Sequence, residues 1–193
     1  MNTQDIESFL QEIRRCRDCG IKPQGMPFVF GSSNSRILVV SEMPSKTAWE
    51  RRDGEKWGRG EIGLPRYCEQ DWLDIGIDEF KSNFFWTHTA NCYTESRAHH
   101  EHCSSKFLSR AIGLVNPKMI LIFGRTASEH FFPNKKMKFL VNKELTCAVS
   151  GKKYDCHVLF HWSKANEKWR KKFRKIHRNA IEDSKKIIEQ IIH

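Results

Sequence analysis

Four of the seven cysteines have a spacing that could hold a metal centre. Cys16 and Cys19 form a C-x-x-C pair, Cys92 follows a predicted strand, and Cys103 begins the next predicted helix. Four thiolates can bind either an iron–sulfur cluster or a zinc ion. The loop between the last two cysteines also offers three imidazoles that could replace a thiolate on zinc: His99, His100 and His102. A cluster, a zinc site and four unligated thiols therefore remain as alternatives.

Polar side chains follow each of four apolar runs that we predict to be strands. In open parallel sheets, ligands bind beyond the carboxyl ends of the strands, so these segments would meet at one edge. Each of them brings a Glu, a His or an Arg, which can move protons or stabilise charge. The four segments are Ser41-Glu42-Met43-Pro44, Thr87-His88, Gly124-Arg125-Thr126 and His161-Trp162-Ser163.

The segment 164–178 is strongly basic. It holds eight Lys or Arg residues and a single acidic residue, Glu167. Because it begins directly after the last polar segment, phosphate contact beside an active site is one interpretation, and a solvated helix face is the other. The residues that we expect to contact DNA here are Lys164, Lys168, Arg170, Lys171 and Lys172, and Lys135, Lys136 and Lys138 could add to them.

The composition favours a folded domain with a polyanionic partner, either nucleic acid or an anionic membrane surface. The chain has 193 residues, 39% of them hydrophobic, and a formal net charge of +10 with a pI near 9.4. These values suit one domain over residues 1–193 and a polyanionic partner. No apolar run approaches the roughly 20 residues of a membrane-spanning helix, and the first residues lack the pattern of a secretory signal. We therefore expect a cytoplasmic monomer with reduced cysteines that is not inserted in a membrane.

The polar segments need strands to position them, and four short runs predict these strands. Three of the runs are almost continuously apolar, which is typical of strands buried on both faces of a parallel sheet. Helical patterns such as the apolar stripe over residues 107–115 lie between them, so the alternation predicts an α/β layered domain. Residues 144–160 have the pattern of a hairpin. The predicted strands are Arg36–Ser41, Phe84–His88, Met119–Phe123 and Cys156–Phe160.

Two amphipathic helices are predicted near the ends of the chain. Residues 4–15 place Ile6, Phe9 and Ile13 on one stripe, and Gly20 is a plausible stop for this segment. Apolar side chains near helical spacing also predict one long basic helix from about residue 164. No internal repeat or low-complexity linker interrupts the chain.

In their order, these motifs resemble the family-4 type of uracil-DNA glycosylases, the iron–sulfur branch of that superfamily. The resemblance covers about residues 10–170. Its motifs run from the C-x-x-C pair through Ile37–Ser45, Gly54-x-x-Trp57, Trp86–Cys92 and Asn116–Gly124 to His161-Trp162-Ser163. It implies a three-layer α/β/α sandwich around a central, mainly parallel four-stranded sheet. It also implies a structural 4Fe–4S cluster held by Cys16, Cys19, Cys92 and Cys103.

The resemblance further implies roles at the site. Trp57 stands where an aromatic side chain of the family stacks on the flipped base. Thr87-His88 replaces a Thr-Asn pair whose Asn reads the Watson–Crick edge of uracil. His161-Trp162-Ser163 replaces a His-Pro-Ser motif in a loop that enters the minor groove, which adds Ser163 to the expected DNA contacts. A family Glu linked to catalysis maps to Glu50.

Departures from the family pattern bear on the choice of base. Serines replace the glycines of the first loop, and Met43 replaces its small central residue, which would change a wall of the base pocket. His88 in place of Asn offers one donor and one acceptor with a different reach. The resemblance thus supports base excision more firmly than it supports uracil, and some members of the superfamily attack modified bases of phage DNA. The residues that we expect to contact the base are Ser41, Met43, Trp57 and His88.

Hydrolysis of an N-glycosidic bond explains why these residue types are needed. Positive charge develops on the sugar, where Glu42 or Glu50 would stabilise it and orient water. Negative charge develops on the leaving base, where His161 would stabilise it. We therefore expect a DNA glycosylase that flips out a base and leaves an abasic site.

Two rival functions remain open. A non-catalytic nucleic-acid-binding module with a structural zinc would also use the histidine-rich loop and the basic segment. A hydrolase of small N-ribosyl compounds would use the strand-end residues but has no need of the basic segment.

Overall fold

The domain is built on a five-stranded sheet with the strand order β2-β1-β3-β5-β4. The computed structural model describes residues 3–21, 29–32, 34–52, 56, 59, 61–163 and 166–193. β1, β2, β3 and β5 run parallel, and β4 pairs antiparallel with β5. The strands are β1 (Ile37–Ser41), β2 (Phe84–His88), β3 (Met119–Phe123), β4 (Leu145–Val149) and β5 (Lys152–Leu159).

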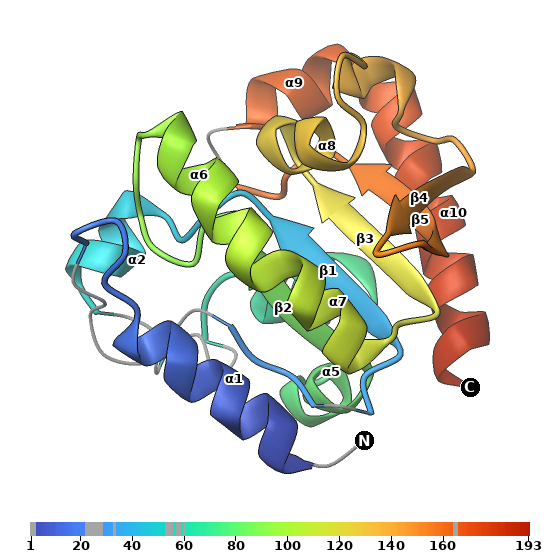
Figure 1. The fold of residues 1–193 in the computed structure, drawn as a ribbon. Coiled ribbons are helices and arrows are strands. Elements are labelled where there is room, and N and C mark those ends of the chain that lie inside the picture. The colour runs from blue at the N-terminus through green and yellow to red at the C-terminus, as the bar shows by residue number, and fades with distance from the viewer. Residues whose placement is uncertain are drawn as a thin grey trace.

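Helices lie on both faces of the sheet, as Figure 1 shows. One layer contains α1, α6 and α7, the other contains α5 and α10, and α8 and α9 lie near the carboxyl ends of the strands. The helices are α1 (Thr3–Arg15), α2 (Lys46–Glu50), α4 (Leu64–Tyr67), η1 (Cys68–Trp72), α5 (Ile77–Asn83), α6 (Arg97–Cys103), η2 (Ser104–Leu108), α7 (Ser109–Val115), α8 (Arg125–Phe131), η3 (Met137–Phe139), α9 (Glu167–Lys172) and α10 (Arg174–Ile192).

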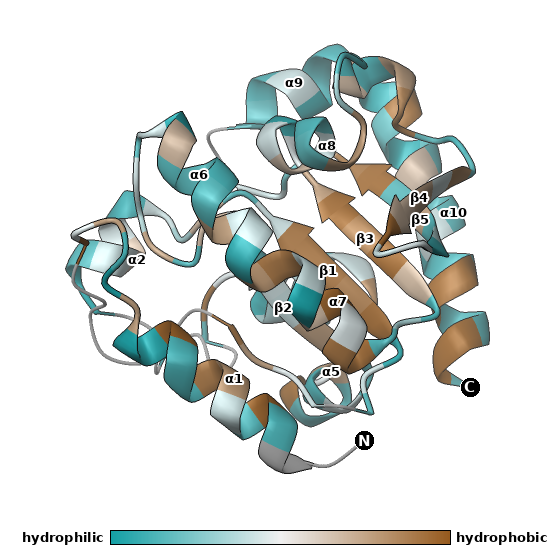
Figure 2. Ribbon diagram, viewed as in Figure 1, coloured by the Kyte–Doolittle hydropathy of each residue, from teal (hydrophilic) through white to brown (hydrophobic). Residues whose placement is uncertain are grey.

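Coverage on both faces explains the continuous apolar sequence of the inner strands. Every residue of β1, β2 and β3 is buried, whereas β4 at the edge is largely accessible. Figure 2 shows the apolar strands in the centre and polar residues on the outward sides of the helices. The predicted three-layer α/β architecture is therefore confirmed.

The prediction of a four-stranded sheet was one strand short. The hairpin predicted over residues 144–160 is present, and β4 and β5 are its two arms. Because β5 belongs to the parallel sheet, β4 joins that sheet as a fifth, antiparallel strand at its edge. β5 accordingly begins at Lys152, earlier than the apolar run predicted, because its first residues pair with β4 and not with the buried parallel strands.

The basic C-terminal segment forms two helices where one was predicted. α9 ends at Lys172 and α10 begins at Arg174, and Phe173 between them has the non-helical torsion angles φ −112° and ψ 36°. The Phe173 ring stacks on Phe160 just after β5, with centroids 5.8 Å apart and planes 5° apart. This contact fixes the break beside the edge of the sheet, so that α9 lies near the strand ends while α10 packs along β5.

Candidate active site and cysteine pocket

The carboxyl ends of the parallel strands border a cavity of about 890 Å³. α2, η3 and α9 supply further walls. The structure brings residues of all four polar segments to this cavity: Ser41, Glu42, Met43, Pro44, His88, Gly124, Arg125, Thr126, His161, Trp162 and Ser163.

His88 is held in place by the end of the neighbouring strand. Ser41 Oγ lies 2.7 Å from His88 Nδ1, and Trp86 Nε1 donates a hydrogen bond to the same Oγ over 3.1 Å. All three side chains are buried, and β1 and β2 are paired so that Ser41 and His88 are in register. The imidazole therefore has a defined orientation before any ligand is bound.

His161 is a neutral imidazole with one nitrogen occupied. The backbone N–H of Ser163 donates to His161 Nδ1 over 3.1 Å, so the neutral ring carries its proton on Nε2. Burial, together with the nearby Arg170 guanidinium, lowers the pKa of His161 to about 4. The ring stacks on Trp162 with centroids 3.9 Å apart. His161 can thus offer an N–H donor, but no positive charge, at neutral pH.

Arg170 acts on the loop that carries His161. Its Nη1 donates to the carbonyl oxygens of His161 and Ser163 over 2.6 and 2.8 Å. The sequence predicts a phosphate contact for Arg170, whereas the structure gives its guanidinium a position that orients this loop. Sequence reasoning missed this role because the partners are backbone oxygens, which no residue type reveals.

The two candidate carboxylates have different surroundings. Glu42 lines the cavity, and its carbonyl oxygen accepts hydrogen bonds from Thr89 Oγ1 and Ala90 N over 2.8 and 3.0 Å, which ties this loop to the end of β2. Glu50 lies on α2 with an exposed side chain, 4.0 Å from Lys46 Nζ, and is not part of the described cavity lining. This position favours Glu42.

The remaining predicted contacts lie around the cavity or outside the described residues. Met43 and Ser163 line the cavity and are half-buried. Lys168, Lys171 and Lys172 are exposed on α9. The predictions for Trp57 and Lys164 fall on residues that lie outside the described part of the chain.

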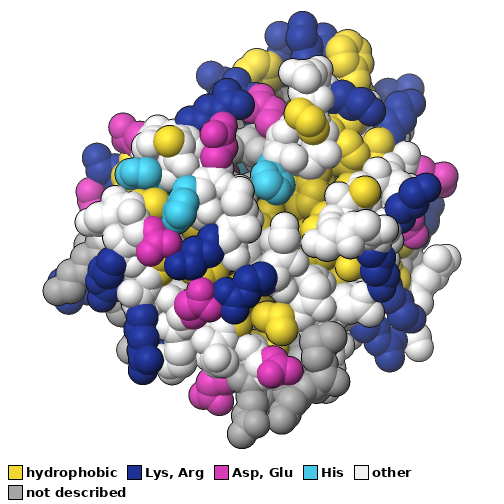
Figure 3. Space-filling view, viewed as in Figure 1, with side chains coloured by type: hydrophobic (Ala, Val, Ile, Leu, Met, Phe, Trp, Pro, Cys, Tyr) yellow, Lys and Arg dark blue, Asp and Glu magenta, His cyan; other side chains and the backbone are white. Residues whose placement is uncertain are grey.

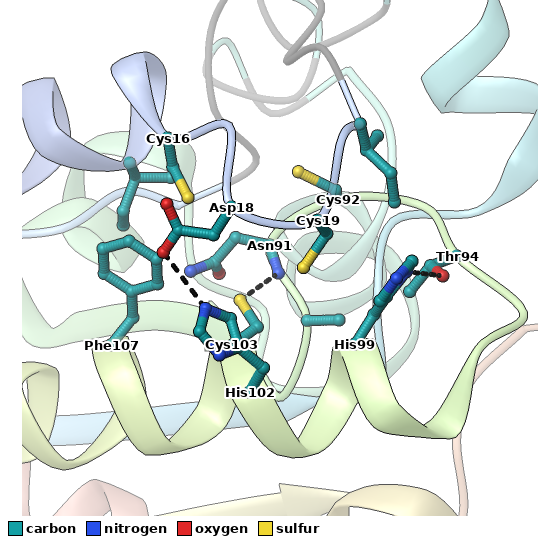
Figure 4. Close-up of a pocket in the computed structure, with 13 residues that line it drawn as sticks. Cys16, Asp18, Cys19, Asn91, Cys92, Thr94, His99, His102, Cys103 and Phe107 are labelled. Carbon is teal, nitrogen blue, oxygen red and sulfur yellow. Dashed lines mark hydrogen bonds and ion pairs between the residues drawn. The ribbon is translucent and has the colours of Figure 1, made fainter.

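All four candidate cysteine ligands line a second, smaller pocket. Figure 4 shows Cys16 and Cys19 from the end of α1 on one side and Cys103 on α6 on the other, with Cys92 beside them. Asn91 N donates to Cys103 Sγ over 3.3 Å. Burial raises the pKa of Cys92 to about 12 and that of Cys103 to about 11.

Ion pairs join the two sides of this pocket. Asp18 accepts hydrogen bonds from Lys106 Nζ and His102 Nε2 over 2.8 and 3.0 Å. Figure 4 draws the contact between Asp18 and His102. Lys106, with His102, lowers the pKa of Asp18 to about 2. Arg110 and Glu12 form a further pair at 2.6 Å. The C-x-x-C segment is therefore held against α6 and η2 by charge as well as by apolar packing.

The donor set is compatible with a cluster of four irons. Within the described ranges, no three His, Cys, Asp or Glu side chains converge closely enough to hold a single metal ion. In a 4Fe–4S cluster each thiolate binds a different iron, so the four sulfurs surround a group larger than one ion. Two histidines considered as zinc ligands have other partners: His99 lies 3.0 Å from Thr94 Oγ1, and His102 contacts Asp18.

Comparison with known proteins identifies the family. The family model described as the Uracil DNA glycosylase superfamily matches residues 28–185, which is most of the chain and includes the strands and every described cavity residue. A comparison with curated proteins gave no significant match. No helix of the described residues is both long and apolar enough to cross a membrane. The chain belongs to the uracil DNA glycosylase superfamily, whose members act on DNA.

Proposed function

We propose that this chain is a DNA glycosylase that flips a base out of DNA, hydrolyses its N-glycosidic bond and leaves an abasic site. The observation that carries the proposal is the state of His161 in the cavity at the strand ends. Because Ser163 N–H occupies Nδ1, the donor that His161 can offer to a ligand is Nε2–H. Membership of the superfamily supports the reaction class.

The proposed chemistry divides the developing charges between two residues. When the C1′–N bond breaks, the electron pair stays on the base and the sugar becomes positive. His161 Nε2–H would donate to an oxygen of the departing base, and its low pKa keeps the ring a neutral donor. Glu42 would stabilise the sugar and orient the water whose oxygen bonds to C1′. The proton released by that water would pass to Glu42 and then to the base or to solvent.

A matched pair of carboxylate variants tests this assignment. Glu42→Gln should reduce the rate of abasic-site formation by about 10² to 10³, because it removes the charge on the sugar side. Glu50→Gln removes an exposed carboxylate outside the described cavity lining and should leave the rate within about twofold. Equal losses in both variants would contradict the assignment, and wild-type protein that binds DNA without forming abasic sites would favour a non-catalytic binding module.

We also propose that the natural base is not plain uracil. An Asn side chain can pair with both O4 and N3–H of uracil through its NH2 and its carbonyl oxygen, whereas a neutral His has one N–H and one bare nitrogen. The Nδ1 position of His88 is already in contact with Ser41 Oγ, and half-buried Met43 lines the same cavity. These features support a modified base that presents a different edge.

Exchange of His88 for the family's residue tests this substrate assignment. His88→Asn should raise the ratio of uracil excision to excision of a modified pyrimidine, measured on otherwise identical oligonucleotides. Ser41→Ala serves as a companion variant, because it removes the contact at His88 Nδ1 without changing the identity of the ring. A wild-type preference for uracil that His88→Asn does not change would overturn the idea.

We further propose that Cys16, Cys19, Cys92 and Cys103 hold a 4Fe–4S cluster with a structural role. The four thiols line one pocket, which supports the proposal. This pocket shares no described lining residue with the strand-end cavity. A bound cluster would join α1 to α6 and would take no part in excision.

A further inference from the structure

Three aromatic rings lead from the end of the sheet to the rim of the strand-end cavity. Phe160 is 5% exposed, Phe173 is half-buried, and Trp169 is 44% exposed. The planes of Phe160 and Phe173 are 5° apart, and so are those of Phe173 and Trp169, whose centroids are separated by 6.3 Å. All three side chains line the cavity. The outermost ring, Trp169, therefore continues a stack that begins in the core.

Trp169 differs from the buried tryptophans of the protein. Trp49, Trp72 and Trp86 are at most 7% exposed and pack in the core. Trp169 keeps nearly half of its surface accessible, although a large apolar side chain is normally stabilised by burial. Phe173 supports its indole from within the fold. Such a ring can accept another flat ring without a rearrangement of the fold.

The charge around Trp169 matches a nucleotide. Lys168 Nζ and Lys172 Nζ lie over the indole ring, 5.7 and 5.6 Å from its centre. Lys171, on the same short helix, forms an ion pair with Glu167 at 2.8 Å. Figure 3 shows Lys and Arg side chains interspersed with hydrophobic ones over the region where α9 lies in Figure 1. An apolar ring surrounded by ammonium groups suits a base with its phosphates.

We propose that Trp169 stacks on an unpaired base next to the nucleotide that enters the cavity, and that the substrate strand is single-stranded or locally opened there. The proposal rests on the proposed function, because it places the flipped nucleotide in the cavity that Trp169 borders. In a duplex, neighbouring bases cover both faces of each base, so an aromatic side chain can stack only where the strand is open. The exposed side chains of Lys168 and Lys172, which lie over the indole, then turn outwards to the adjoining phosphates.

Equilibrium binding of two single strands tests the proposal without requiring excision. One strand is a short thymine oligonucleotide, and the other is a chain of abasic nucleotides of the same length. Trp169→Ala should weaken binding of the thymine strand by about tenfold and leave binding of the abasic strand unchanged. Trp169→Phe, which keeps an aromatic face, should restore most of the affinity.

Phe139→Ala is the matched control. Phe139 is 65% exposed and has Lys138 Nζ 4.7 Å from its ring centre, yet it does not line the described cavity. Phe139→Ala should not change the ratio of the affinities for the thymine strand and the abasic strand. The inference is overturned if Trp169→Ala weakens both strands equally or weakens neither, provided that its melting temperature matches the wild type.

The outcome also separates this inference from the proposed function. If the wild type excises bases but Trp169→Ala binds the thymine strand normally, the stacking role is wrong and the glycosylase function stands. If Trp169→Ala shows the base-dependent loss but the wild type excises no base, the stacking surface stands and the excision proposal is wrong.

Discussion

The strand-end cavity and the cysteine pocket both join residues that are far apart in the sequence, but they hold their functional atoms differently. In the cavity, hydrogen bonds orient individual side chains: Ser41 contacts His88, and the Ser163 backbone contacts His161. In the pocket, buried thiols from separate segments meet, and ion pairs such as Asp18 with Lys106 hold the segments together. The cavity thus orients individual polar groups, whereas the pocket gathers four thiols between segments that ion pairs hold together.

This difference leads to opposite expectations for substitutions. Loss of a cavity side chain should lower the reaction rate and leave the stability almost unchanged, because the sheet beneath the cavity is intact. Loss of a cysteine should lower the stability and leave the chemistry of the remaining folded protein unchanged, because the two sites share no described lining residue.

The largest expected effect is on the rate after His161→Ala. The variant removes the proposed donor to the leaving base, so single-turnover excision should slow by about 10² to 10³. DNA affinity should change little, because His161 is not a phosphate-binding cation at neutral pH. A large fall in melting temperature would instead place His161 among the structural residues.

Cys92→Ala should have the largest effect on stability. Because binding of the proposed cluster would be coupled to folding, the variant should lose iron, and its melting temperature should fall by about 10 °C or more. Cys68→Ala is the control, because this buried cysteine is outside the described pocket and should keep the iron. Iron content and visible absorbance are measured on anaerobically purified protein. Full iron retention in Cys92→Ala would contradict the ligand assignment.

A smaller effect is expected for the cations of α9. Lys168→Glu combined with Lys172→Glu should weaken DNA binding irrespective of sequence and reduce the slope of log affinity against log salt by about 2. Lys153→Glu makes the same kind of change near the start of β5, far from the strand ends, and should have little effect. Unchanged salt dependence in the double variant would mean that α9 is only a solvated surface.

The smallest effect concerns the dependence of stability on pH. The folded pKa of His161 is about 4, below its usual value of 6.5, so the unfolded chain binds a proton more readily between these values. Preferential protonation of the unfolded chain therefore lowers the stability of the wild type as the pH falls from 6.5 towards 4. His161→Gln should make the melting temperature less dependent on pH in this window, and an identical slope in both proteins would contradict the low pKa.

Much of the framework was predictable from the sequence, because apolar runs fully buried on both faces are hard to mistake. β2 and β3 begin and end where their sequences predict. The fifth strand was not predicted as part of the sheet, because a hairpin pattern does not reveal which strand it will extend. The break at Phe173 was missed because its cause is a contact with Phe160, which only the folded chain creates.

The residue types of the candidate site were predictable from the sequence, but which of these side chains line the cavity was not. Glu42 and Glu50 have the same chemistry, and only the structure separates the cavity-lining residue from the exposed one. Arg170 was interpreted as a phosphate contact from its charge, although its guanidinium contacts backbone oxygens. The exposure of Trp169 also depends on tertiary packing, and an aromatic residue within a basic segment was the one available signal.

The most direct test of the central claim is abasic-site formation by the wild-type protein on single-stranded and duplex oligonucleotides that carry uracil or modified bases. We predict abasic sites at one class of base, and His161→Ala should fail to form them while it still binds the same DNA. Binding of every oligonucleotide without an abasic site in any of them would contradict the claim that the strand-end cavity excises bases.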